Sequence, residues 1–192
     1  MRCEGLRAKI LTNMINRLKK LLKSAVVRGD FTLTSGKKAE FYINGRNITL
    51  TPEGAYLSGK LMLDALIKDR ATAVGGPTIG ADPIVGSIAC LAHIKKYPLK
   101  TFIVRKSQKA HGDNKLIEGP ALNKKDRIIL VDDTATTGKS IMESAQIVRS
   151  MGYKASKALV LVDREEGAKE NLKKIGIKLS SLFIARDLLE HE

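Results

Sequence analysis

Two adjacent carboxylates, Asp132 and Asp133, follow an apolar run in the segment IILVDDTATTGKS, which extends from residue 128 to residue 140. The residues after them are small, hydroxyl-bearing or glycine, and the segment ends in Gly-Lys-Ser. Backbone N–H groups and hydroxyls at the start of a helix form a favourable environment for phosphate. The segment therefore predicts a site for a phosphorylated molecule at the carboxyl end of a strand, where open α/β sheets bind ligands.

The ending in Gly-Lys-Ser suggests the ATP-binding loop, whose pattern is G-x-x-x-x-G-K-[ST]. In this chain Asp133 occupies the position of the first glycine. A carboxylate there would direct negative charge into a site built for an anion, so the ATP interpretation is excluded. The two acids are better suited to a ligand rich in hydroxyls, such as a ribose that also carries a phosphate. The alternative is that they only cap the next helix.

A second candidate segment, residues 107–119, is polar, contains two glycines and joins two predicted strands. Long loops in compact domains are usually either functional or disordered. Taken alone, the segment is compatible with both interpretations.

The elements that must position these residues alternate between strand and helix from residue 71 onward. Such alternation predicts a parallel sheet with helices on both faces. We expect strands at 71–76, 100–106, 127–133 and 156–164, helices at 82–95, from Gly138 and at 165–176, and a closing segment at 180–189.

The N-terminal part has a different pattern. An amphipathic helix is predicted by apolar residues at every fourth position, and a later helix by Thr51-Pro52. Two short β-rich stretches at 31–36 and 40–47 predict a hairpin. We therefore expect one domain over residues 1–192, with 1–50 as an N-terminal hood of helix and hairpin and 71–192 as the α/β core. The stripe of the first helix comprises Leu6, Ile10, Met14, Leu18 and Leu22.

Composition limits the classes of function. The net charge is +14, but the lysines are scattered along the chain and aromatic residues make up only 4%, so nucleic-acid binding is disfavoured. No apolar run is long enough to span a membrane, and the charged N-terminus is a poor secretory signal. The two cysteines are too few for a disulfide scaffold. These features predict a cytoplasmic protein.

The apolar strand, the two acids and the T-x-T-T-G-x-S pattern resemble the signature of type I phosphoribosyltransferases, which use phosphoribosyl pyrophosphate (PRPP). Within that group, FTLTSGKKAEFYIN, VRKSQKAHG and ALVLVDREEGAKENL resemble stretches of orotate phosphoribosyltransferases. The resemblance spans almost the whole chain. It implies the type I phosphoribosyltransferase fold and the reaction of orotate with PRPP to give orotidine 5′-monophosphate and pyrophosphate. It also implies Mg²⁺ as cofactor, bound mainly through the substrate.

The resemblance also implies roles for individual residues. Asp132 and Asp133 would hold the ribose hydroxyls and stabilise positive charge in the transition state. Thr136 and Arg164 would contact orotate, although Arg164 could instead form a surface salt bridge with Glu165 or Glu166. The residues that would bind the 5′-phosphate are Thr134, Ala135, Thr136, Thr137, Gly138, Lys139 and Ser140.

The same resemblance implies a mobile loop that covers the pyrophosphate. Lys109 and His111 would be catalytic, with His111 donating a proton or hydrogen bond to the leaving group near neutral pH. Tyr42 and Ile43 of the hairpin would form a lid over the base or belong to the core. The basic residues of the loop are Arg105, Lys106, Lys109 and His111.

Two positions depart from the pattern of the family. Many members have a lysine before the Ser-Gly of the hairpin and another in the turn after the first core strand. This chain has Thr34 and Ile79 there. Both lysines would face the pyrophosphate, so backbone N–H groups, Mg²⁺ and the loop must supply more of that role.

The family also implies a symmetric homodimer. Loop 105–119 would be shared between the subunits, with Lys106 reaching into the neighbouring active site. Two alternatives to the assignment are a phosphoribosyltransferase for another nucleobase and a PRPP-sensing regulator that binds nucleic acid through its charge.

Overall fold

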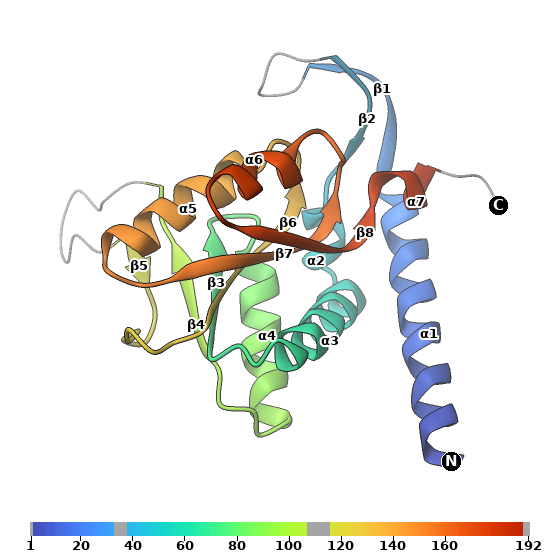
Figure 1. Cartoon of the computed structure of the whole chain (residues 1–192). Coiled ribbons are helices and arrows are strands. Elements are labelled where there is room, and N and C mark those ends of the chain that lie inside the picture. Colours follow the sequence, from blue (N-terminus) through green and yellow to red (C-terminus); the bar gives the residue numbers. More distant parts are fainter. Residues whose placement is uncertain (1, 33–37, 107–115, 190–192) are drawn as a thin grey trace.

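The computed structural model describes residues 2–32, 38–106 and 116–189, and its centre is a six-stranded sheet (Figure 1). The strand order is β5-β4-β3-β6-β7-β8. Strand β5 is antiparallel to β4, and the other pairs are parallel, so the predicted parallel sheet is confirmed with one antiparallel edge strand. The strands are β3 (Ala73–Pro77), β4 (Lys100–Val104), β5 (Ile117–Glu118), β6 (Ile128–Ala135), β7 (Ala155–Asp163) and β8 (Lys178–Ile184).

Helices cover both faces of the sheet, as the alternating pattern predicts. In β6, Ile128 and Leu130 pack in one apolar cluster, and Ile129 and Val131 pack in another. The first cluster includes residues of α5 and α6, and the second includes residues of α3 and α4. Figure 1 shows these two helix pairs on opposite sides of the strands. The helices are α3 (Pro52–Lys68), α4 (Asp82–Ile94), α5 (Lys139–Ser150) and α6 (Ala168–Lys174).

The hood consists of α1 (Arg2–Ser24), an antiparallel ribbon of β1 (Val26–Thr32) and β2 (Lys38–Ile43), and the short helix α2 (Arg46–Thr49). It packs with the C-terminal α7 (Ala185–Leu189) in a third apolar cluster that contains Leu18, Leu22 and Ile43. Figure 1 shows the ribbon rising above the carboxyl ends of the core strands. The hood therefore faces the edge of the sheet at which the acid pair lies.

The hairpin is confirmed, but its predicted bounds are wrong. Strand β1 begins at Val26, earlier than the sequence pattern suggested, and β2 ends at Ile43. Residues 46–49 form α2 rather than the end of a strand. The change of direction occurs at Gly45, where the backbone lies against Asp133. A tertiary contact thus decides the local structure of this segment.

The opening helix is confirmed, but its apolar stripe is buried only in its C-terminal half. Leu18 and Leu22 are fully buried, whereas Leu6 is 62% exposed and Ile10 is 50% exposed. The first half of α1 extends beyond the elements that its second half contacts. None of the described helices combines the length and apolar character needed to cross a membrane.

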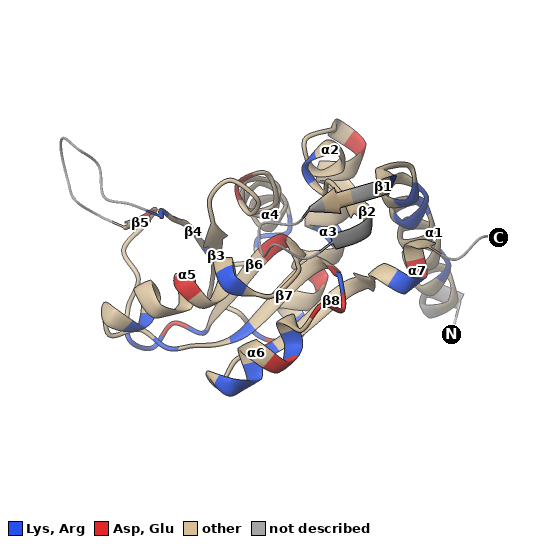
Figure 2. Cartoon of the chain, turned by 90° about the horizontal axis from the view of Figure 1, so that it is seen from above, with Lys and Arg blue, Asp and Glu red and all other residues tan. Residues whose placement is uncertain are grey.

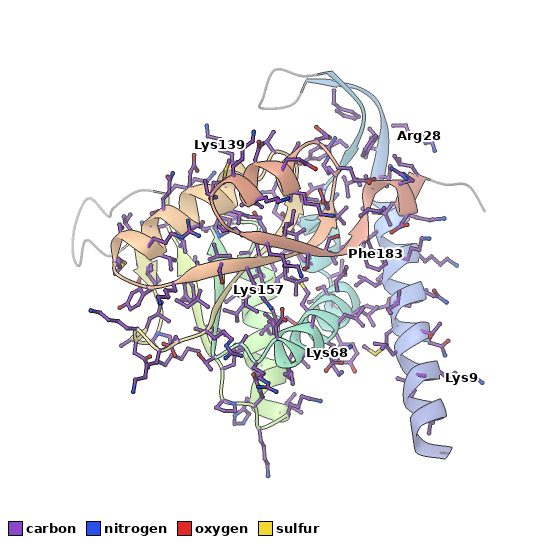
Figure 3. All side chains as sticks on the ribbon, in the orientation of Figure 1. Lys9, Arg28, Lys68, Lys139, Lys157 and Phe183 are labelled. Carbon is purple, nitrogen blue, oxygen red and sulfur yellow. The ribbon has the colours of Figure 1, made fainter. Side chains whose placement is uncertain are left out.

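Basic residues are spread over the surface. Figure 2 shows lysine and arginine on α1 at one end of the molecule and on α6 and α5 elsewhere. In Figure 3, the exposed side chains of Lys9 and Lys139 project from well-separated parts of the chain. The positive charge is therefore distributed rather than gathered in one stripe of the described surface.

Candidate active site

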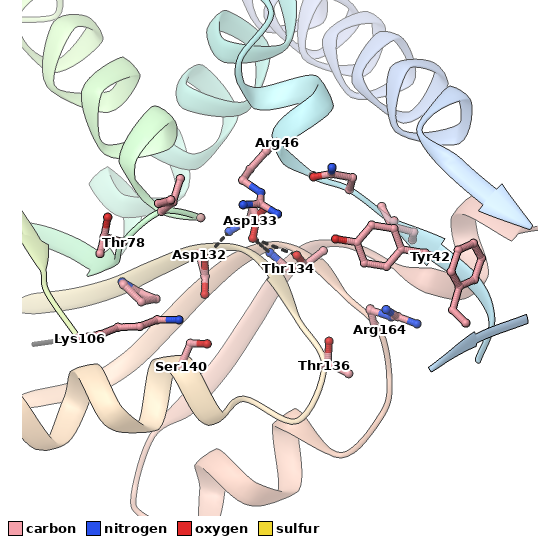
Figure 4. A pocket seen from close by; sticks show the side chains of 17 residues that line it. Tyr42, Arg46, Thr78, Lys106, Asp132, Asp133, Thr134, Thr136, Ser140 and Arg164 are labelled. Atoms are coloured by element: carbon pink, nitrogen blue, oxygen red, sulfur yellow. Dashed lines mark hydrogen bonds between the residues drawn. The ribbon is translucent and has the colours of Figure 1, made fainter. Parts of the chain in front are cut away.

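A cavity of about 600 Å³ lies between the hood and the carboxyl edge of the sheet. Its lining comes from β1, β2 and the start of α2, from the turn after β3, from the end of β6 and from Arg164 after β7. Figure 4 shows the acid pair near the centre of this lining, with Arg164 and Tyr42 on one side and Lys106 and Thr78 on the other. The predicted sugar and base residues are therefore brought together in one place.

The acid pair is buried and held by hydrogen bonds. Asp132 is 6% exposed and Asp133 is 8% exposed. The backbone N–H of Asp133 donates to Asp132 Oδ1 at 2.9 Å, and the N–H and hydroxyl of Thr134 donate to Asp133 Oδ1 at 2.7 and 2.9 Å. The following helix has Gly138 as its N-cap and no side-chain cap. The alternative that these acids merely cap α5 is therefore wrong.

The electrostatics of the pair favour a positively charged neighbour. Burial raises the pKa of Asp132 well above its usual value, and the negative charge of Asp133 raises it further. The ammonium group of Lys106 opposes this shift of the pKa. Positive charge that develops beside Asp132 would be stabilised, because it would relieve the repulsion between two buried carboxylates.

Two glycines allow the surrounding backbone to approach the acids closely. A Cβ atom at Gly45 would lie 3.0 Å from the Cβ and Oδ2 of Asp133. A Cβ atom at Gly80 would lie 2.4 Å from Asp132 Oδ1, which is too close for any real contact. The hood and the turn after β3 therefore both contact the carboxylates through backbone that carries no side chain.

The loop after the acids forms a second cavity of about 510 Å³, which shares Asp132, Thr134 and Ser140 with the first. Gly138 has a φ of 78°, and this left-handed conformation allows the chain to turn into α5. Asn171 of α6 donates from Nδ2 to the carbonyl oxygen of Thr137 at 3.1 Å and fixes the loop. All the loop residues predicted to bind phosphate line this cavity: Thr134, Ala135, Thr136, Thr137, Gly138, Lys139 and Ser140.

Arg164 lies at the other side of the first cavity together with Thr136. Its side chain is 3% exposed and forms an ion pair with Glu166 at 2.8 Å. It also donates to the carbonyl oxygen of Phe41 at 3.1 Å and lies 4.9 Å over the Phe41 ring. Arg164 therefore does pair with a neighbouring glutamate, but as a buried residue of the cavity and not as part of a surface salt bridge.

Residues of the hairpin contribute to the apolar core and to the wall of the first cavity. Ile43 is buried in the hood cluster and also lines the cavity, and the half-buried Tyr42 lines it too. The rings of Tyr42 and Phe31 are 5.9 Å apart. Ile43 therefore belongs both to the core and to the cavity wall, whereas Tyr42 belongs to the wall.

A third cavity of about 600 Å³ adjoins the first and shares Arg46, Thr78, Ile79 and Lys106 with it. Arg105 also lines it and forms an ion pair with Glu118 at 3.3 Å. The start of the predicted loop is thus in place beside the acids. Lys109, His111 and Thr34 lie outside the described residues.

Some lining residues were not singled out from the sequence. Gly45 and Arg46 fall in the stretch 40–47 that the sequence predicts as a strand, and Thr78 and Gly80 flank Ile79 in the turn after the first core strand. Their importance depends on contacts between distant segments, so no local pattern marks them.

The oxygen donors of the site could supply some, but not all, of the ligands that a hard cation needs. Within the ranges that the structure describes, no group of three or more His, Cys, Asp or Glu side chains is placed to hold a metal. The two adjacent carboxylates offer hard oxygen donors, and Mg²⁺ is commonly held by one or two carboxylates together with substrate phosphates. The residues present therefore fit Mg²⁺ that arrives with a phosphorylated ligand.

No protein-family model matches the chain. It is 42% identical over 159 residues to the orotate phosphoribosyltransferase of Aquifex aeolicus, covering 83% of this chain and 86% of that protein. It is 38% identical over 168 residues to that of Nostoc sp., covering 88% and 81%. Among solved structures, the orotate phosphoribosyltransferase of Mycobacterium tuberculosis H37Rv in complex with PRPP matches with a TM-score of 0.74 and 31% identity, over 91% of this chain and 98% of that one.

Proposed function

The chain belongs to the orotate phosphoribosyltransferase family, and from this premise we propose that it transfers the phosphoribosyl group of PRPP to orotate. The products are orotidine 5′-monophosphate and pyrophosphate. The observation that carries the proposal is the position of the acid pair, which lies between a phosphate-binding loop and a buried arginine within connected cavities.

Each part of the connected cavities binds a different group of the two substrates. The loop from Thr134 to Ser140 receives the 5′-phosphate, the acid pair receives the ribose, and Arg164 with Thr136 receives the anionic base. The bond from ribose C1 to the pyrophosphate oxygen breaks, its electron pair leaves with pyrophosphate, and a bond from C1 to a ring nitrogen of orotate forms as that nitrogen loses its proton. Positive charge develops on the sugar meanwhile, and the buried carboxylates stabilise it without having to reorganise.

Mg²⁺ would enter with PRPP, and Asp132 and Asp133 are the residues that would face it. When bound, the ion neutralises charge on the departing pyrophosphate. Arg105 and Lys106 add positive charge on the same side, and Lys109 and His111 complete the proposed set of loop residues. Two carboxylates without a dedicated metal cage agree with an ion held mainly by its substrate.

The test of the function is to follow the absorbance of orotate with purified protein. Orotate should be consumed only when both PRPP and Mg²⁺ are present. Consumption of adenine, hypoxanthine or uracil with orotate untouched would establish a phosphoribosyltransferase for another base. PRPP binding without consumption of any base, together with tight binding of nucleic acid, would establish a regulator.

We also propose a homodimer in which Lys106 acts in the active site of the neighbouring subunit. The support is the family resemblance of the loop together with the place of Lys106, which is exposed at the rim where the cavities meet. Lys106 also lines the cavity of its own chain, so action within one subunit is the competing outcome. The exposed thiol of Cys90 is compatible with the reducing cytoplasm that we propose as the location.

Subunit mixing separates these outcomes. Lys106→Ala and Asp133→Asn are prepared separately, and each should be inactive. If Lys106 acts in the neighbouring site, a hybrid dimer has one site with both defects and one intact site. Random exchange makes about half of the dimers hybrid, so roughly a quarter of the wild-type activity should return. No recovery after demonstrated exchange would exclude the shared site.

A further inference from the structure

The pyrophosphate side of the cavity lacks a cation at a position where the family pattern expects one. Ile79 occupies the turn after β3, is 60% exposed and lines both the first and the third cavity. Its side chain cannot pair with an anion. A departing pyrophosphate carries several negative charges, so a further positively charged group from another element would stabilise it there.

Arg46 lies next to this position. Its side chain lines the same two cavities as Ile79, together with Thr78 and Lys106. Figure 4 shows its side chain extending toward the cavity from the hood, while Lys106 enters from the opposite side. Two cations from different parts of the chain thus face the same space.

Arg46 also differs from the other arginines of the site in its contacts. Arg105 pairs with Glu118, and Arg164 pairs with Glu166. Within the described residues, the side chain of Arg46 has neither a hydrogen-bond partner nor an ion-pair partner, although it is half-buried. A guanidinium group that is partly removed from water and unpaired is available for an anionic ligand.

The backbone that carries Arg46 is firmly held. Ile48 and Thr49 of the same helix are buried, and Thr49 N–H donates to the carbonyl oxygen of Gly45 at 2.9 Å. A Cβ atom at Gly54 of α3 would lie 2.1 Å from the carbonyl oxygen of Ile48, so α2 and α3 are in direct backbone contact. Arg46 therefore extends from a fixed support, as a preorganised charge must.

We propose that Arg46 binds the pyrophosphate group of PRPP and takes the place of the lysine that is absent at Ile79. Its planar fork can donate two parallel hydrogen bonds to phosphate oxygens, which a single lysine ammonium cannot match in direction. The same contact would hold these oxygens in bound PRPP and in the pyrophosphate that leaves, so it contributes to substrate binding. The inference rests on the proposed function, since it needs PRPP as the ligand.

The test compares Arg46→Gln with the wild type in two assays. In calorimetry with Mg²⁺ and pyrophosphate alone, the variant should bind roughly 10–100-fold more weakly, the usual effect of losing a charged hydrogen bond. Binding of ribose 5-phosphate, which lacks pyrophosphate, should be unchanged. In the orotate assay, the KM for PRPP should rise by a similar factor (roughly 10–100-fold), and the KM for orotate should stay within about twofold.

Two further variants sharpen the result. Arg17→Gln removes a positive charge from the hood outside the cavity, where Arg17 pairs with Glu53, and it should leave pyrophosphate binding unchanged. The double variant Arg46→Gln/Ile79→Lys returns a cation to the turn and should recover part of the binding. Thermal melting of each variant verifies that the fold is retained.

The outcomes separate the inference from the function on which it rests. If the wild type fails to consume orotate, the proposed function is wrong. If the wild type is active but Arg46→Gln binds pyrophosphate normally, the inference alone is overturned. It is also overturned if ribose 5-phosphate binding falls by the same factor, because Arg46 would then act on the structure of the whole site, or if the double variant recovers nothing.

Discussion

The two walls of the cavity are built in different ways. The wall formed by the core is the end of β6, which is buried on both faces and pairs in register with β7 from Ile129 to Ala135, which lies opposite Asp163. The wall formed by the hood rests on a two-stranded ribbon, and the short helix α2 beside it is held in backbone contact with α3. Isolated two-stranded ribbons are marginally stable, so the position of this wall depends on its contacts with the core.

The difference corresponds to two tasks in the proposed reaction. Stabilising charge on the ribose requires carboxylates that do not move, and a strand in the middle of a sheet holds them in place. Admitting and releasing a base requires a surface that can adjust, and the two-stranded ribbon that carries Tyr42 is the less firmly supported part of the cavity wall. We therefore expect changes in the core wall to act on turnover and changes at the hood to act on substrate binding.

The largest effect is expected at the end of β6. Asp133→Asn keeps the volume of the side chain and an oxygen that can accept from Thr134, but it removes the charge. Turnover should fall about 100-fold or more, the scale of one preorganised electrostatic contact in a transition state. Steady-state kinetics with saturating orotate and PRPP measure this change.

A matched control lies just before the opposite end of the same strand. Asp126 pairs with Lys100 at 2.8 Å, far along the strand from the acid pair. Asp126→Asn should leave turnover unchanged. If Asp133→Asn keeps normal turnover and only lowers the melting temperature, the division of tasks between the walls is wrong.

A smaller effect is expected where the two walls meet. Arg164 follows a core strand but donates to Phe41 of the hood. Arg164→Ala should raise the KM for orotate about 10–100-fold, the cost of a lost hydrogen bond to a charged group, and should change the KM for PRPP by less than about twofold. Initial-rate measurements with each substrate varied in turn give both constants.

Phe41→Leu is the control for this experiment. It removes the ring beneath the guanidinium group and keeps the cation, so the KM for orotate should change little. Equal increases in both Michaelis constants of Arg164→Ala would show that Arg164 supports the whole site and does not select the base.

The contrast between the core wall and the hood wall also explains how much of the structure the sequence could predict. Strands β3, β4, β6 and β7 lie where the sequence predicts them, because a strand buried on both faces is a continuous apolar run, and the start signals place α4, α5 and α6. Strand β5 lies instead in the segment expected as a loop, because two residues at a sheet edge give no periodic pattern. The acids and the phosphate loop follow directly from a strand that is buried on both faces. Their place at the carboxyl edge of the sheet is a property of parallel sheets in general.

The hood could not be predicted to the same degree. The assignment of Gly45 and Arg46 to a strand failed because the backbone at Gly45 contacts Asp133, which is distant in sequence. The periodic stripe of α1 predicted a helix correctly, but periodicity does not tell whether a partner surface exists at Leu6. Arg46 was missed for the same reason, since its importance depends on where α2 lies.

The smallest effect concerns stability. It tests whether burying the acid pair in the core wall lowers the free energy of unfolding. The pKa of Asp132 is raised by burial and by Asp133, so the native state binds its proton more tightly than the unfolded state does. Stability from this residue is complete below its usual pKa of 3.8 and is lost as the pH rises through the raised value. Asp132→Asn should therefore be more stable than the wild type near neutral pH.

The expected rise in melting temperature is a few degrees, because about 1 kcal/mol corresponds to ~2–4 °C in a domain of this size. The difference in stability between the variant and the wild type should shrink toward pH 4 and below.

Asp126 is a control whose pKa shifts in the opposite direction: desolvation works to raise its pKa, but hydrogen bonds from Lys100, Asn123 and Thr72 prevail and lower it. Asp126→Asn should thus be less stable than the wild type near neutral pH, and this difference should also shrink as the pH falls. Melting curves of both variants across this range should diverge from the wild type in opposite directions. If Asp132→Asn instead loses stability near neutral pH, the carboxylate is satisfied where it lies, and the field that we assign to the acid pair is absent.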